Sequence, residues 1–282
     1  MKKSKKTTVK ARKFAPGDYV RVVPVHLPKP SVSIDELSAR HKDEGEQDLF
    51  DGRMHAAPAD AHLAYNGGPL LVNAAVFTIF WGTKWDTTPA SMQLMSDLNK
   101  FFTAILISPA IDQLQEYNVP GQAIGHGSLI GTKLIKTNAP ARSITDSAIQ
   151  KQLKAWVAAG TVPKPTKNTL YFIYLDPGIV SIMGGSKSCQ SYCGYHNNVG
   201  NIFYAVMPYP ACDGCLAGLT AFNALTGTSS HELCEAITDP IPGSGWYDST
   251  NGEIGDICAW NFKQVSGYTV QLEWSNQQNA CV

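Results

Sequence analysis

One short segment of the sequence combines residue types that can bind and use a metal ion. Residues 227–240 read GTSSHELCEAITDP. Good helix formers fill the centre of this segment and a proline ends it, so the pattern predicts a helix. On a helix, His231 and Glu235 leave the same face because they are four residues apart. An imidazole and a carboxylate so placed can occupy two corners of a zinc tetrahedron, and Glu232 can reach a water at the metal.

A zinc site that keeps one open position needs a third protein ligand. We predict that this ligand is Glu253, which follows the helix in sequence, and that Asp256 orients His231. The two carboxylates could also exchange these roles. Calcium is the less favoured metal, because the spacing of the oxygen donors does not match an EF-hand. Its ligands would be Asp248, Asn251, Glu253 and Asp256.

Three hydroxyl side chains precede the metal motif, namely Thr228, Ser229 and Ser230. Hydroxyls at the start of a helix cap its free backbone N–H groups, and we expect these residues to do so. A serine nucleophile is disfavoured because the sequence contains no G-x-S-x-G elbow.

Strands and helices alternate along the rest of the chain. Apolar runs predict strands over 70–81, 123–136, 170–175 and 201–207. Apolar residues spaced for one helical face predict helices over 91–107 and 143–159. This alternation is typical of an α/β or α+β fold in which helices cover a mixed sheet. Neither an internal repeat nor an interior linker interrupts the pattern, so a single domain is expected.

All seven cysteines lie in the last third of the chain, from Cys189 to Cys281. Such clustering favours a framework of disulfides formed in an oxidising environment. We therefore expect an extracellular protein, although no signal peptide can be read at the N-terminus.

The pairing of the cysteines is only partly constrained by their positions. Cys258 and Cys281 flank the last expected strand and are predicted to pair, and Cys234 is predicted to be the odd thiol. The other four are expected to form disulfides, either as a short link within the C-x-x-C motif or between the two pairs, or to hold a structural zinc: Cys189, Cys193, Cys212 and Cys215.

The charge pattern separates the chain into two parts. The 23 basic and 23 acidic side chains give zero net charge, which argues against a nucleic-acid partner. Residues 1–53 carry 12 basic and 8 acidic side chains, and we predict a disordered, charged tail there. Residues 54–282 form the predicted metallohydrolase domain. The longest apolar stretch is interrupted by Asn73 and Thr78, so no membrane span is expected.

Several motifs together resemble the EXORDIUM-like (phosphate-induced protein) family. They are YNGGPLL at 65–71, CQSYCGYH at 189–196, SHELCEAITDP at 230–240, GWYD at 245–248, EIGDIC at 253–258 and QLEWSN at 271–276. Microbial members of this family resemble secreted zincin-type metallopeptidases. The resemblance implies a zincin-like domain with an active-site helix and a disulfide-rich C-terminal third. It also implies zinc at His231 and Glu235 and a hydrolytic role for Glu232.

A zincin-type site is bordered by an edge strand along the substrate cleft. Tyr195 and His196 lie just before the expected strand at 201–207, and either could donate a hydrogen bond to the oxyanion of the reaction. His196 could instead be a metal ligand or cap a disulfide loop.

These features predict a zinc-dependent metallopeptidase, a monomeric hydrolase acting on peptide or protein substrates through an activated water, with Glu232 as general base. The alternative is a non-catalytic extracellular binding or signalling module that keeps the metal helix for structure. A cell-wall carbohydrate binder would need an exposed aromatic row, formed by Trp246, Tyr247 and Trp260.

Overall fold

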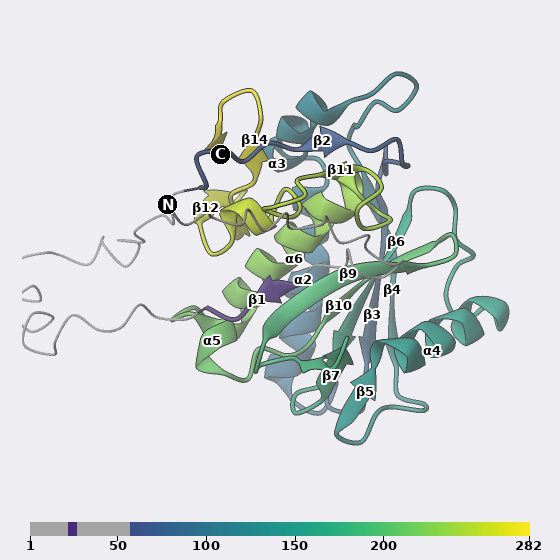
Figure 1. The fold of residues 1–282 in the computed structure, drawn as a ribbon. Helices are drawn as coiled ribbons and strands as arrows, with labels where there is room; N and C mark the ends of the chain where they lie inside the picture. The colour runs from purple at the N-terminus through teal and green to yellow at the C-terminus, as the bar shows by residue number, and fades with distance from the viewer. Residues whose placement is uncertain (1–21, 27–56) are drawn as a thin grey trace, which may run out of the picture.

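The computed structural model describes residues 22–26 and 57–282 (Figure 1). These residues form a mixed α/β structure with several β-sheets and three disulfides. The largest sheet has six strands in the order β1-β9-β10-β6-β3-β4. Its strands are β1 (Val23–Pro24), β3 (Ala75–Trp81), β4 (Ser128–Ile135), β6 (Thr169–Leu175), β9 (Tyr192–Val199) and β10 (Ile202–Met207).

The centre of this sheet is parallel and one end is antiparallel. β4, β3, β6 and β10 run parallel to one another, whereas β9 runs antiparallel to β10 and β1 runs antiparallel to β9. Central parallel strands are buried on both faces and read as continuous apolar runs. The sequence contains such runs at 70–81, 170–175 and 201–207. The strands expected there are confirmed, although the first of them begins only at Ala75. β9 lacks such a run and was not predicted.

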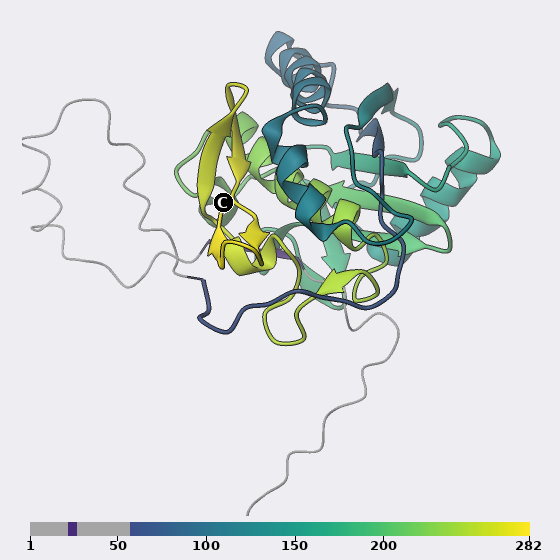
Figure 2. The ribbon, with the colours of Figure 1, turned by 90° about the horizontal axis from the view of Figure 1, so that it is seen from above.

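Three long helices pack on the two faces of the sheet (Figures 1 and 2). They are α2 (Pro89–Ile105), α4 (Asp146–Ala158) and α6 (Ala221–Thr238). Successive side chains of a strand point to opposite faces, and β3 divides accordingly. Val76 and Phe80 pack in the core that includes α2 and α6, whereas Ile79 and Trp81 pack in the core that includes α4. The helices expected over 91–107 and 143–159 are confirmed with shifted ends.

The metal-motif helix starts earlier than the sequence suggested. The N-cap of α6 is Thr220, whose side chain accepts a hydrogen bond from the backbone N–H of Asn223. Thr228, Ser229 and Ser230 therefore lie inside the helix and are buried, so the prediction that they cap it is wrong.

Gly227 lies inside α6 although glycine is a poor helix former. At this position it permits a close approach between two elements of the fold. A Cβ atom at this position would lie 2.7 Å from Cε1 of Phe262, which is too close for any other residue without a shift. The glycine thus lets Phe262 pack directly on the helix.

The remaining elements form small sheets and short helices around this frame. They are β2 (Ala64–Tyr65) with β11 (Trp246–Tyr247), β5 (Ser143–Thr145) with β7 (Val180–Met183) and β8 (Ser186–Lys187), β12 (Phe262–Val265) with β13 (Tyr268–Gln271), β14 (Trp274–Ser275) with β15 (Ala280–Cys281), and the short helices α3 (Pro109–Asp112), η1 (Gln113–Tyr117), α5 (Asp213–Leu216) and η2 (Asp256–Cys258).

Three disulfides link the C-terminal third. Cys258 pairs with Cys281, and Cys234 is a free, buried thiol, so both of these predictions are confirmed. The remaining four cysteines form two links between the pairs, Cys189–Cys212 and Cys193–Cys215. The short link within the C-x-x-C motif is therefore wrong, and the four thiolates are not available for a structural zinc.

Five residues of the expected tail belong to the folded structure. Within 22–26, Val23 and Pro24 form β1 and pair with β9. The rest of the expected tail, with its basic and acidic blocks, lies outside the described residues. No helix in the described ranges, 22–26 and 57–282, is long and apolar enough to cross a membrane.

Candidate metal centre

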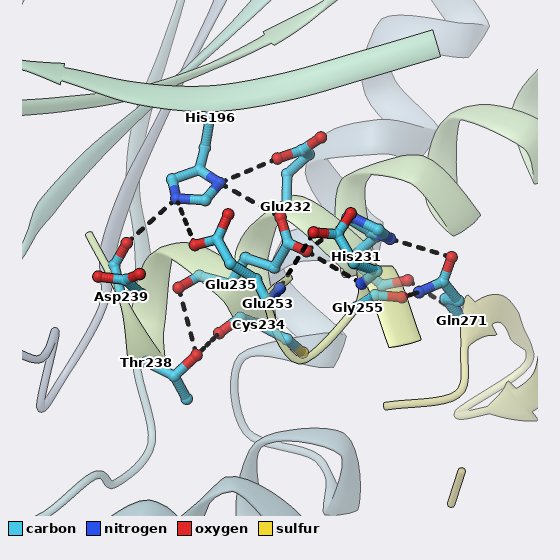
Figure 3. Close-up of polar contacts among 12 residues, drawn as sticks. His196, His231, Glu232, Cys234, Glu235, Thr238, Asp239, Glu253, Gly255 and Gln271 are labelled. Carbon is cyan, nitrogen blue, oxygen red and sulfur yellow. Dashed lines mark hydrogen bonds and ion pairs between the residues drawn. The ribbon is translucent and has the colours of Figure 1, made fainter. Parts of the chain in front are cut away.

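Two histidines and four carboxylates meet where α6 passes under β9 (Figure 3). His231, Glu232 and Glu235 come from α6 and His196 from β9. Glu253 and Asp256 come from the loop between β11 and β12, which contains η2. Asp256 has 12% of its side chain exposed, and the other five have at most 1%.

Three of these side chains converge as ligands of one small cation would. His231 Nε2 lies 2.9 Å from Glu235 Oε1 and 4.0 Å from Asp256 Oδ1. One potential ligand atom from each of the three lies within 4.8 Å of the others. Ligand atoms at ~2.1 Å from a tetrahedral zinc are roughly 3.4 Å apart, so these separations fit a metal of that size.

The buried polar atoms of the cluster support this interpretation. Among the described residues, His231 Nε2 makes no hydrogen bond despite its short distance to Glu235, and Glu235 Oε2 has no hydrogen-bond partner. Buried polar atoms normally have partners, because an unsatisfied one costs about 1–3 kcal/mol. A cation between these atoms would satisfy them, so the residues fit a metal ion.

The orientation of His231 is fixed by Gln271 from β13. The Nδ1 atom of His231 lies 3.0 Å from Gln271 Oε1, and the amide group of Gln271 donates to Gly255 O at 2.9 Å. Since Gln271 Oε1 is an acceptor, Nδ1 carries the proton of the neutral imidazole, and Nε2 is the nitrogen whose lone pair can bind a metal. The orienting role expected of Asp256 therefore belongs to Gln271, which sequence reasoning did not assign.

Asp256 instead shapes the loop and faces the cluster. Its Oδ2 accepts from the backbone N–H of Glu253 at 3.0 Å, and its own N–H donates to Glu235 Oε1 at 3.2 Å. Gly255 lies against the imidazole of His231, because a Cβ there would be 2.8 Å from two ring atoms. Asp256 Oδ1 is thereby held on the side of the loop nearest His231.

His196 forms a second polar group on the opposite side of Glu235. Its Nδ1 lies 3.1 Å from Glu232 Oε2 and 3.4 Å from Glu235 Oε2, and its Nε2 lies 3.1 Å from the carbonyl of Asp239. Its neighbours on both sides are acceptors, so both ring nitrogens donate and the imidazolium form satisfies them. Both nitrogens of His196 are thus engaged by protein acceptors, whereas Nε2 of His231 has no hydrogen-bond partner among the described residues, which favours the His231 group as the metal position.

The pKa values of both histidines lie well above the usual value, so the two groups differ in their hydrogen bonds and not in the direction of their pKa shifts. Burial acts to lower the pKa of His196, but the charge of Glu253, the hydrogen bond to Glu232 and the nearby carboxylate of Glu235 raise it. For Glu235, burial acts to raise the pKa, but His231 and His196 together outweigh burial and lower the pKa to about 2. Glu235 is thus ionised, as a metal ligand must be.

Glu253 lies nearer His196 than His231. Its Oε1 is 3.4 Å from His196 Nε2, and neither of its carboxylate oxygens has a hydrogen-bond partner in the described part of the chain. Burial raises its pKa well above the usual range. The distances therefore favour Asp256 over Glu253 as the third ligand, the exchange of roles that the sequence left open.

Tyr195 does not join the cluster. Its hydroxyl donates to Asp146 Oδ1 at 2.9 Å, and its ring packs in the core on the α4 side of the sheet. Adjacent residues of a strand point to opposite faces, so only one of Tyr195 and His196 can reach α6. The catalytic role expected of Tyr195 is not compatible with this placement.

The contacts of Asp248 do not favour the calcium alternative. In the calcium alternative, both oxygens of Asp248 already accept hydrogen bonds, from the N–H groups of His62, Thr250 and Asn251 and the amide of Asn251.

The aromatic row is not exposed. Trp246 packs against the rings of Tyr65 and Tyr117, and Tyr247 is buried. This arrangement does not provide the flat exposed platform expected of a carbohydrate binder.

Replacing Gln271 should weaken metal binding while preserving the fold. In Gln271→Met the backbone N–H can still donate to Ser230, but His231 loses the acceptor that fixes its tautomer. We expect zinc affinity to fall about 10–100-fold, as for other losses of an outer-shell partner, measured by competition with a chromogenic chelator. Gln264→Met on β12 is the matched control and should bind zinc normally. Equal affinities in the two variants would contradict the role of Gln271.

Without metal, stability should fall as the pH rises from about 5.5 to 8. His196, His231 and Glu253 have raised pKa values, and burial raises that of Asp239 to about 6. Such groups stabilise the fold fully below their unfolded pKa values and lose that contribution as the pH rises through the folded ones. Glu235 acts oppositely, but only near its pKa of about 2.

The measurement is the midpoint of thermal unfolding of chelator-treated protein across this range. Added zinc should raise the midpoint more at pH 8 than at pH 5.5, because the ligands bind metal in their deprotonated forms. A midpoint without metal that is constant or increases toward pH 8 would show that the cluster does not carry the predicted protons.

Comparison with known proteins assigns no family to the chain. No protein-family model matches it, and no curated protein matches it. The function therefore has to follow from the cluster of His196, His231, Glu232, Glu235, Glu253 and Asp256.

Proposed function

We propose that the chain is a zinc-dependent peptidase with a zincin-like fold, in which His231, Glu235 and Asp256 hold the metal and Glu232 is the general base. The observation that carries the proposal is the convergence of the three ligand atoms, with Gln271 directing the lone pair of His231 toward them. An imidazole among the ligands favours zinc over calcium, which takes oxygen ligands.

Zinc bound at this position would act as a Lewis acid on a peptide carbonyl and on water. Glu232 is suited to take the proton of that water, because burial raises its pKa and makes it a stronger base than an exposed carboxylate. Its Oε2 contacts His196 Nδ1, whereas its Oε1 has no hydrogen-bond partner among the described residues. Oε1 is therefore the atom that would accept the proton.

His196 can assist the same step from β9. As an imidazolium it keeps Glu232 in the ionised form that can accept a proton, through the contact of 3.1 Å between His196 Nδ1 and Glu232 Oε2. The sequence suggested that His196 donates to negative charge on the substrate, and this would require one of its N–H groups to leave Glu232 or the carbonyl of Asp239.

The wider features of the chain support an extracellular peptidase. Three disulfides favour an oxidising environment. The motifs that resemble the EXORDIUM-like family include the metal helix, the loop with Glu253 and Asp256, and the segment with His196.

A non-catalytic module with a structural metal is the second candidate. It is favoured by one observation: five of the six side chains of the cluster have at most 1% exposure. Structural zinc sites are closed, whereas catalytic sites keep a position open to water and substrate.

Glu232→Gln separates the two candidates. The amide keeps the size of the side chain but cannot accept the proton, so the peptidase proposal predicts normal zinc content and a loss of peptide hydrolysis of at least ~100-fold. The measurements are metal analysis and cleavage of quenched fluorescent peptide libraries. Glu116→Gln, the same change on η1 and outside the cluster, should keep both zinc and activity.

Two outcomes of this experiment would contradict the peptidase proposal in different ways. Stoichiometric zinc in a wild-type protein that cleaves no peptide would favour the structural module. Absence of zinc, with Glu235→Ala indistinguishable from wild type in metal content, would remove the metal site itself.

A further inference from the structure

The outer edge of β9 is bonded by a segment from the far N-terminus of the chain. β1 pairs antiparallel with β9, with Val23 opposite Gly194 and Pro24 opposite Tyr192, on the side of β9 that is not taken by β10 (Figure 1). Val25 N–H then donates to Ser191 O at 3.2 Å. An extended segment thus lies along the strand that carries His196.

Most of the contacts of this segment are made by its main chain. His26 N–H donates to Gly214 O at 2.7 Å, and the indole of Trp260 donates to Pro24 O at 2.9 Å. Backbone contacts of this kind accept many sequences, because every residue offers the same groups. These hydrogen bonds are therefore compatible with many sequences, although the rings of His26 and Trp260 also pack on each other, with centroids 5.5 Å apart.

One side chain of the segment is held more selectively. Val23 is 2% exposed and packs in a small apolar cluster with Cys193 and Cys215, which form a disulfide with each other. Pro24, the next residue, is exposed. A peptide on this edge would therefore be selected for a small aliphatic side chain at the position of Val23.

The same edge leads directly to the metal cluster. A Cβ atom on Gly194 would lie 2.6 Å from Thr228 Cγ2 and 3.5 Å from Glu232 Oε1, so β9 rests on α6 beside the proposed base. His196 is two residues further along β9 and points toward Glu232 and Glu235 (Figure 3). A peptide in the register of β1 that continued by two residues would lie opposite His196.

We propose that the β9 edge is a binding surface for an extended peptide with a small aliphatic anchor, and that β1 is its internal occupant. β1 has to leave the edge before another peptide can bind. That the bound peptide is also the substrate rests on the proposed function, whereas its binding to the edge does not.

An edge occupied in this way would restrict the approach of a second peptide to the strand that carries His196. With β1 in place, the chain holds its own extended segment next to the proposed base. Release of two paired residues and one anchor is a small change compared with unfolding of any central strand, so the edge can open while the sheet persists.

Val23→Asp in the full-length protein tests the proposal. An unpaired carboxylate in the apolar cluster should displace β1 from the edge. We expect amide exchange in residues 191–196 to become at least about tenfold faster by hydrogen–deuterium exchange. We also expect a labelled synthetic peptide of residues 20–28 to bind at least about tenfold more tightly than to wild type, because it no longer competes with β1. Pro24→Asp, which adds the same charge to an exposed side chain, should match wild type.

Trp260→Phe is a second variant that leaves Val23 unchanged. It removes the indole N–H that donates to Pro24 while keeping an aromatic ring, and it should change exchange and peptide binding in the same direction by a smaller factor. If both variants, shown to be folded by circular dichroism, keep wild-type exchange and peptide affinity, the proposal is overturned.

Activity distinguishes this proposal from the proposed function. If Val23→Asp cleaves peptides faster than wild type and the Val23→Asp/Glu232→Gln double variant does not, both proposals are supported. If Val23→Asp binds the peptide tightly but cleaves nothing, the binding surface stands and the peptidase proposal fails.

Discussion

The structure depends on how four carboxylates are kept together in a site nearly without water. Glu232, Glu235, Glu253 and Asp256 repel one another, and the low dielectric of the interior strengthens this repulsion. His196 offsets part of it as a cation. The neutral form of His231 turns the lone pair of Nε2 toward the cluster, because Nδ1 donates to Gln271. The position between His231, Glu235 and Asp256 then has an excess of negative charge, which a divalent cation would neutralise.

The fold supplies the positions of this cluster from three separate parts of the chain. α6 contributes residues one turn apart, but the other groups need tertiary structure to reach them. The loop with Asp256 is joined to α6 through Glu235, to β13 through Gln271, and by the Cys258–Cys281 disulfide to the C-terminal strand β15. These links hold the loop and β13 against α6, so Asp256 stays beside Glu235 and His231 despite the repulsion of the carboxylates.

The local parts of this arrangement could be predicted from the sequence, and the non-local parts could not. The central strands and α6 follow from apolar runs and helical spacing, and the shared face of His231 and Glu235 follows from the geometry of one helix. Gln271 gives no local signal, because its role depends on where β13 packs, 40 residues from His231. Strand alternation could have shown that Tyr195 and His196 face opposite sides, but β9 contains Gly and Asn residues and did not resemble a strand. The presence of Gly227 inside α6 likewise has a non-local cause, because the ring of Phe262 packs where a side chain would otherwise lie.

The two edges of β9 have different roles in the structure. Its inner side pairs with β10 over five residue pairs, which fixes His196 over α6. Its outer edge is exposed to pairing by any extended chain, and proteins normally block such edges to prevent association. Here the block is a two-residue strand of the same chain, and it ends in a proline, which has no N–H to offer a further strand. A block this short would protect the edge from stable association while remaining weak enough to be exchanged for another peptide, beside the strand that positions His196.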